Sequence, residues 1–261
     1  MSEAVEVAPG LRETKDDGVH TWWLCNEKRR NAVSPGALRW MAARGPELRG
    51  EIVVLRGTGG HAFCAGFDLS ALAEPPPPGA MPDAPLIACT TAMRDADATF
   101  VAVLDGYAIG AGVELACACD LRIARRGIFF AIPAAELAVV YHATGLASVR
   151  AVLGPAGVRR LVLLGERLPA EDAWSAGALV RLVDADALED AVTDVIERLR
   201  RAAPGSTRGN RDLLRALDRG NIPDAVRAEH ELRRRAAYAS EDHQEARRAR
   251  IEGRAPRFRG R

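Results

Sequence analysis

Two glycine-bearing segments carry the residue types best suited to chemistry at a carbonyl group. They read Ala-Phe-Cys-Ala-Gly-Phe-Asp-Leu over residues 62–69 and Gly-Tyr-Ala-Ile-Gly-Ala-Gly-Val-Glu-Leu over residues 106–115. Each follows a run of apolar, β-branched residues, which predicts a turn at the end of a strand. Small residues in such turns let a ligand approach the backbone, whose N–H groups can stabilise an oxyanion. Glu114 adds a carboxylate in the first turn of a predicted helix, so the two segments favour acyl chemistry.

Further segments accompany these turns, and together they resemble the crotonase (enoyl-CoA hydratase/isomerase) superfamily. The resemblance is carried, besides the turns, by residues 26–32, 164–173, 176–180 and 254–261. It implies an α/β fold with a crotonase-like ββα spiral core in residues 1–195 and a C-terminal helical trimerisation region in residues 196–261. A homotrimer or homohexamer is expected for the same reason.

The resemblance implies a site made of two backbone donors and a glutamate. Negative charge develops on the oxygen of a reacting thioester carbonyl, and preorganised N–H groups stabilise it by about 3 kcal/mol each. By resemblance these donors belong to Phe67 and Ala111, and the Phe67 ring is expected to reshape the acyl site. Glu114 matches the first of two glutamates with which family hydratases hold and activate water. A carboxylate that only complements the helix dipole, for under about 1 kcal/mol, is the alternative role for Glu114.

The sequence departs from the hydratase pattern at the second glutamate. Family hydratases have Phe-Gly-x-Pro-Glu there, whereas Pro133 is followed by Ala134 in this chain. Alanine cannot transfer a proton. Glu136, Tyr141 and His142 are the candidates to replace the lost acid, because histidine titrates near neutral pH and tyrosine donates a hydrogen bond. A solvent-facing Glu136 and a structural His142 remain the alternatives.

Substrate binding is also taken from the resemblance. It places coenzyme A as part of the thioester substrate, with no separate cofactor and no metal, and basic side chains near residue 28 would pair with its phosphates. An exposed cluster of loop charges is the alternative role for these basic residues. The binding residues expected are Lys28, Arg29, Ala32, Ala62, Cys64, Ala65, Gly66, Phe67, Asp68, Leu69, Gly110, Ala111, Pro133 and Ala134. Asp68 is further predicted to act as a cap or turn acceptor.

The reaction expected from these features is that of an enoyl-CoA hydratase/isomerase. A thioester enolate would be stabilised in a backbone oxyanion hole, with Glu114 as acid and base. Because the second glutamate is missing, a different enolate reaction, such as isomerisation or decarboxylation, is the first alternative. A non-catalytic acyl-CoA binding protein is the second.

Composition limits the other classes of function. The 261 residues are 48% hydrophobic and 27% charged, which excludes a wholly disordered chain. The net charge of +1 gives no reason to expect a nucleic-acid partner, and the arginine-rich end of the chain is read as a solvated helix face or a phosphate contact. The five cysteines lack metal-ligand spacing and favour a reducing, cytoplasmic location. No run approaches the roughly 20 apolar residues that a membrane span needs.

Hydrophobic periodicity predicts alternating strands and helices. Strands are expected over residues 19–24, 52–55, 100–104, 121–124 and 128–131. Helices are expected over residues 35–43, 86–97, 157–164, 170–176, 185–202 and 224–253, and an Ala-rich helix is expected to begin near residue 112. The proline-rich residues 74–85 are expected to form an exposed loop beside the acyl pocket. This strand–turn–helix alternation is typical of an α/β core.

Overall fold

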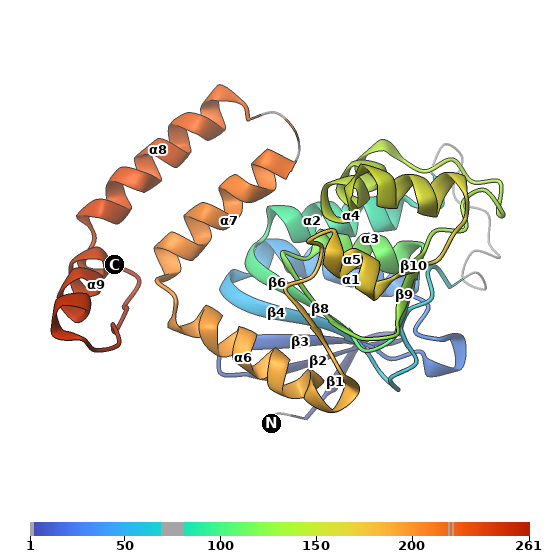
Figure 1. Cartoon of the computed structure of the whole chain (residues 1–261), viewed down its shortest axis with the longest axis horizontal. Coiled ribbons are helices and arrows are strands. Elements are labelled where there is room, and N and C mark those ends of the chain that lie inside the picture. The colour runs from blue at the N-terminus through green and yellow to red at the C-terminus, as the bar shows by residue number, and fades with distance from the viewer. Residues whose placement is uncertain (1–2, 69–80, 219, 221) are drawn as a thin grey trace. The chain divides into compact units, whose positions relative to one another are not determined.

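The computed structural model describes residues 3–68, 81–218, 220 and 222–261. The chain forms two compact units, Met1–Val192 and Thr193–Arg261. The first unit holds both sheets, and the second is helical (Figure 1). The mixed α/β architecture confirms the predicted fold class.

The larger sheet contains seven strands within the described residues. Their order is β1 (Val5–Ala8), β2 (Leu11–Asp16), β3 (Val19–Leu24), β4 (Arg49–Gly57), β6 (Asp97–Leu104), β8 (Leu121–Arg125) and β11 (Arg181–Val183). The strands β1 to β3 pair antiparallel, and those from β3 to β11 pair parallel. The strand β6 is buried from Ala98 to Leu104. This is expected of a parallel strand that is covered on both faces of the sheet.

The smaller sheet brings the two glycine-bearing segments together. Its order is β10 (Leu168–Pro169), β9 (Phe129–Ala131), β7 (Tyr107–Ile109) and β5 (Ala62–Cys64). Ala62 pairs with Tyr107 and Cys64 with Ala108, both in parallel register. Because parallel strands end at the same edge of a sheet, the turns that follow β5 and β7 lie next to each other.

Helices of the first unit gather on one side of the larger sheet (Figure 1). They are α1 (Pro35–Arg44), α2 (Ala84–Asp95), α3 (Ala111–Ala118), α4 (Ala143–Leu163) and α5 (Ala170–Ser175). Among the described residues, short 3₁₀ turns cover Glu27–Arg29, Gly45–Glu47 and Ala185–Ala187. The core between α1 and the sheet is aromatic, with the ring of Trp22 edge-on to Trp40 at 5.4 Å and to Phe100 at 5.6 Å.

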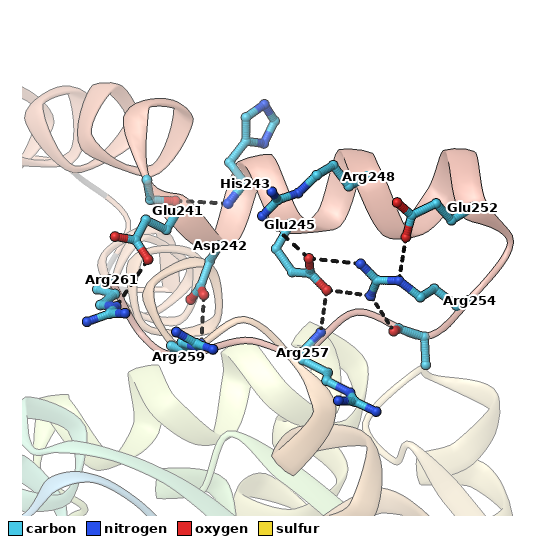
Figure 2. Close-up of polar contacts among 12 residues, drawn as sticks. Glu241, Asp242, His243, Glu245, Arg248, Glu252, Arg254, Arg257, Arg259 and Arg261 are labelled. Carbon is cyan, nitrogen blue, oxygen red and sulfur yellow. Dashed lines mark hydrogen bonds and ion pairs between the residues drawn. The ribbon is translucent and has the colours of Figure 1, made fainter.

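The second unit is helical within the described residues. Helix α6 (Leu188–Arg201) enters it, followed by α7 (Pro204–Asp218), α8 (Asp224–Ala239) and α9 (Glu241–Glu252). The C-terminal tail folds back along α9, as Figure 2 shows. The Asp242 carboxylate accepts hydrogen bonds from the backbone N–H groups of Arg259 and Gly260, at 2.7 and 2.8 Å.

Several predicted elements differ in extent from the observed ones. The helix predicted over 224–253 is wrong as a single element, because the chain leaves the helical region at Ser240. The predicted start of α2 is also wrong, since Pro85 is tolerated in the first helical turn, where its missing N–H has no helical partner. Hydrophobic periodicity did not predict α7 or the first half of α4, a helix that is interrupted at Gly154. Most of the expected proline-rich loop, residues 74–80, lies outside the described residues.

Candidate active site

The first turn, after β5, is held in place from the segment before α1. Val33 N–H donates to the carbonyl of Gly66 at 2.8 Å, and Asp68 N–H donates to the carbonyl of Val33 at 3.0 Å. These two bonds bracket Phe67 and leave its own N–H out of the pairing. Gly66 has a φ of 102°, a conformation that glycine adopts without steric cost.

The second turn, after β7, leads directly into α3. Gly110 has a φ of 53°, and its N–H donates to the carbonyl of Ala131 at 2.9 Å. Gly112 lies against the backbone of Cys64 so closely that no larger residue fits there. A Cβ on Gly66 would lie 4.0 Å from the backbone nitrogen of Ala111. The two turns therefore meet at the start of α3.

Two amides at this meeting point are available for a ligand. Among the described residues, nothing accepts a hydrogen bond from the N–H of Phe67 or of Ala111. The Ala111 amide is at the N-terminus of α3, where the first N–H groups have no partner inside the helix. Helix N-termini also carry positive potential, which favours an anionic oxygen there.

Glu114 lies in the first turn of α3 with 1% of its surface exposed. Burial raises the pKa of its carboxyl group, because a low-dielectric interior disfavours the charged form. His142 and Arg94 oppose this shift, whereas the negative charge of Asp83 adds to it. Glu114 therefore keeps its proton to higher pH than an exposed glutamate does.

His142 faces Glu114 from the start of α4. Its Nε2 atom lies 2.9 Å from Glu114 Oε2, and neither atom makes a hydrogen bond within the described residues. On the other side of the ring, Nδ1 accepts a hydrogen bond from the Gly145 N–H at 3.0 Å and contacts Thr144 Oγ1 at 2.9 Å. The imidazole thus caps α4 and presents Nε2 to the carboxylate.

Tyr141 completes the group around Glu114. Its ring is stacked beside that of His142, with the planes 8° apart, and the charge of Glu114 acts on its phenol. Burial, followed by the negative charge of Glu114, strongly raises the pKa of the phenol. The hydroxyl therefore stays protonated and remains a hydrogen-bond donor.

The structure does not bring Glu136 to this group. Its side chain is exposed, and its Oε1 atom would be 3.4 Å from a Cβ placed on Gly165. Pro133 and Ala134 follow β9, and Ala134 is buried with 4% exposure. The position where the resemblance leads one to expect a second glutamate thus carries a buried methyl group.

The expected coenzyme A segment lies beside β5. Asn31 donates from Nδ2 to the carbonyl of Ala62 at 2.8 Å, and Ala65 N–H donates to the carbonyl of Arg30 at 3.0 Å.

The charged side chains of this segment differ in their surroundings. Arg29 forms an ion pair with Asp68, whereas Lys28 lies exposed in the 3₁₀ turn. The remaining expected binding residues in this region are Ala32, Cys64 and Gly66, and Leu69 lies outside the described residues.

Three residues near Glu114 were not predicted from the sequence. Asp83 and Arg94 come from α2 and its N-terminal cap, and they act on Glu114 through their charges. Nothing in their local sequence signals this, because the packing of α2 against α3 creates the proximity. Gly145 is the third, since a Cβ there would lie 2.5 Å from Glu114 Oε2 and 2.8 Å from His142 Nε2.

Comparison with known proteins decides the family. The model of the enoyl-CoA hydratase/isomerase family matches residues 15–261. The chain belongs to this family. Membership supports an acyl-CoA enzyme of crotonase type, and it confirms the resemblance inferred from the sequence.

Individual members of the family share both sequence and fold with the chain. A carnitinyl-CoA dehydratase of Salmonella paratyphi B is 33% identical over 186 residues, 70% of this chain and 69% of the relative. One from Proteus mirabilis is 32% identical over 182 residues, with the same two shares covered. The crystal structure of enoyl-CoA hydratase from Mycobacterium tuberculosis H37Rv has a TM-score of 0.82 and 28% identity, covering 97% of this chain and all of that one.

A more distant structure supports the fold alone. The enoyl-CoA hydratase/carnithine racemase from Magnetospirillum magneticum has a TM-score of 0.85 and 24% identity, covering 97% of this chain and 96% of that one. Within the described ranges, no three His, Cys, Asp or Glu side chains group as metal ligands. No helix of those ranges combines the length and apolar character that crossing a bilayer demands.

Proposed function

We propose that this family member adds water to the double bond of a 2-enoyl-CoA, or removes it from a 3-hydroxyacyl-CoA. The amides of Phe67 and Ala111 stabilise the thioester enolate, and Glu114 moves the proton. The observation that carries the proposal is the buried carboxylate of Glu114, three residues after the Ala111 amide, which has no hydrogen-bond acceptor among the described residues.

One carboxylate is enough for the proposed reaction, because the proton that it takes from water is the proton that it later returns to the substrate. Glu114 takes a proton from water while the water oxygen bonds to C3, and the π electrons move toward the thioester oxygen. That oxygen becomes negative between the two amides, which is worth about 10²–10³ in rate for each donor. The enolate then takes a proton from Glu114 at C2, so the carboxylate is regenerated. Dehydration is the reverse sequence.

The names of the relatives support this chemistry. Two of them are carnitinyl-CoA dehydratases, and loss of water from an acyl-CoA is the reverse of hydration. We infer a substrate of the same thioester class for this chain. The segment around Lys28, Ala32 and Ala62 is proposed to hold coenzyme A, together with the turns at Ala65 and Gly110.

The test is hydration of a short trans-2-enoyl-CoA, followed by loss of the conjugated thioester absorbance. Glu114→Gln is expected to lower kcat by at least about 10²-fold, because general acid–base catalysis contributes that much. Glu136→Gln is the matched control, since it removes an exposed carboxylate beside Gly165 and is expected to keep full activity. Equal activity of wild type and Glu114→Gln would exclude Glu114 from the reaction.

A second candidate keeps the enolate and changes its fate. Ala134 is buried where hydratases have a glutamate, and the exposed Glu136 does not replace it, which favours isomerisation or decarboxylation. Ala134→Glu distinguishes the two proposals. A gain in hydration together with loss of a different native activity would favour the second candidate, and tight binding of acyl-CoA without any turnover would point to a binding protein.

We propose a homotrimer or homohexamer formed through the helical region, in a cytoplasmic protein. All five cysteines are free thiols, which agrees with a reducing compartment. Light scattering after size-exclusion chromatography measures the number of subunits directly.

A further inference from the structure

We propose that His142 is a catalytic residue that works as a neutral hydrogen-bond donor, holding the hydroxyl oxygen that enters or leaves the acyl chain. This inference rests on the proposed hydration or dehydration and assigns the part of the missing second glutamate. Glu114 carries the proton, and His142 fixes the oxygen.

The hydrogen bonds of the imidazole determine where its proton resides. Nδ1 accepts from the Gly145 N–H at 3.0 Å, so its lone pair is engaged and it carries no proton. In the neutral ring the single proton is therefore on Nε2. That nitrogen is the atom 2.9 Å from Glu114 Oε2. Because the first turn of α4 supplies the donor, the tautomer is set by the backbone.

Two polar atoms converge there without a hydrogen bond. Glu114 Oε2 and His142 Nε2 are both buried, and neither has a hydrogen-bond partner among the described residues. A buried polar atom of this kind costs about 1–3 kcal/mol if it stays unsatisfied. One hydroxyl group satisfies both atoms, because it donates to the carboxylate and accepts from the imidazole N–H. Water is such a group in hydration, and the 3-hydroxyl of the acyl chain is its counterpart in dehydration.

The donor assists the step in which the C3–O bond breaks. Negative charge develops on the departing oxygen, and the Nε2–H hydrogen bond stabilises it while Glu114 supplies the proton that turns it into water. The electron pair from C2 forms the double bond. His142 ends the reaction as it began, so the step needs no charged imidazole.

The experiment separates the two nitrogens by substitution. His142→Asn keeps a side-chain acceptor for the Gly145 amide, since asparagine is a good N-cap, but it removes the donor facing Glu114. His142→Gln places an amide N–H near the position of Nε2. We expect His142→Asn to fold and to lose about 10²-fold in kcat, the loss typical of one such donor, whereas His142→Gln keeps most of the activity.

A second readout does not depend on turnover. Nitrogen-15 NMR of histidine-labelled protein, with the His142 signals assigned by their loss in His142→Asn, is expected to show the Nε2–H tautomer at neutral pH. A proton on Nδ1, or a doubly protonated ring, would overturn the inference. Wild-type activity in His142→Asn would also overturn it.

Activity measurements distinguish a failure of the proposed function from a failure of the role of His142. If Glu114→Gln is inactive while His142→Asn is fully active, the hydratase proposal stands and the role of His142 falls. If wild type turns over neither a 2-enoyl-CoA nor a 3-hydroxyacyl-CoA, the proposed function falls, and His142 loses its catalytic assignment with it.

Discussion

Arg29 Nη1 lies 3.0 Å from Asp68 Oδ1, and this ion pair joins the segment before α1 to the turn that carries Phe67. Asn26 donates to the other carboxylate oxygen of Asp68 at 3.4 Å. Arg29 and Asp68 were both among the expected binding residues, with Asp68 also predicted as a cap or turn acceptor, and the structure pairs their side chains. We infer that they position the Phe67 amide, whose neighbours Gly66 and Asp68 are bonded to Val33.

Asp68→Asn tests this positioning role. Arg29 is half-exposed, and such ion pairs contribute about 0–1 kcal/mol to stability, so the urea midpoint is expected to change little. The kcat is expected to fall several-fold, because the Phe67 amide is less well oriented toward the enolate oxygen. Glu47→Gln, which breaks the Arg44–Glu47 pair at the end of α1, is the matched control and is expected to leave kcat unchanged. Equal kcat values for both variants would contradict the positioning role.

The buried Glu114 predicts a pH-dependent effect on stability. Its pKa is raised in the folded state, chiefly by burial, so ionisation opposes folding as pH rises through that pKa. Glu114→Gln is therefore expected to raise the free energy of unfolding at pH 8, and the gain should shrink toward pH 5. The groups acting on Glu114 are His142, Tyr141, Arg94, Asp83 and Cys117.

Urea unfolding of wild type and Glu114→Gln at several pH values measures this effect. Glu136→Gln is the control, because surface substitutions usually change stability by less than about 0.5 kcal/mol. A stability difference between wild type and Glu114→Gln that does not vary with pH would show that burial has little effect on the ionisation of Glu114.

The sequence predicted the turns better than their surroundings. Gly66 and Gly110 predicted turns because glycine adopts positive φ values at no steric cost, and both have positive φ in the structure. The apolar runs before them are strands. Composition cannot give the register that pairs Ala62 with Tyr107, because pairing between strands distant in sequence depends on the whole sheet. The positions of Asp83 and Arg94 depend on helix packing in the same way.

The C-terminal tail offers a prediction that is independent of the catalytic site. Glu245 accepts hydrogen bonds from the guanidinium of Arg254 and from the backbone N–H of Arg257, which lower its pKa to about 2 (Figure 2). At neutral pH the carboxylate thus holds the tail against α9. Glu245→Gln is expected to speed tryptic cleavage after Arg257 by several-fold, because the freed tail fits a protease more readily.

Mass spectrometry of timed digests measures that cleavage rate. Glu252→Gln is the matched control, because it removes one contact to Arg254 and leaves the bonds of Glu245 in place. Equal cleavage rates in all three proteins would mean that Glu245 does not restrain the tail.

Gly145 gives the sharpest steric test of the proposed site. A Cβ at this position would lie 2.5 Å from Glu114 Oε2 and 2.8 Å from His142 Nε2, so Gly145→Ala forces the two groups apart without removing either. We expect kcat to fall by about 10²-fold, since a misplacement of about 1 Å in an active site costs that much. Gly209→Ala is the control, because a Cβ there meets no described atom within 4 Å. In α7 that change is expected to stabilise the protein by up to about 1 kcal/mol and to leave kcat unchanged. If Gly145→Ala retained wild-type kcat, the closeness of Glu114 and His142 would have no part in the reaction.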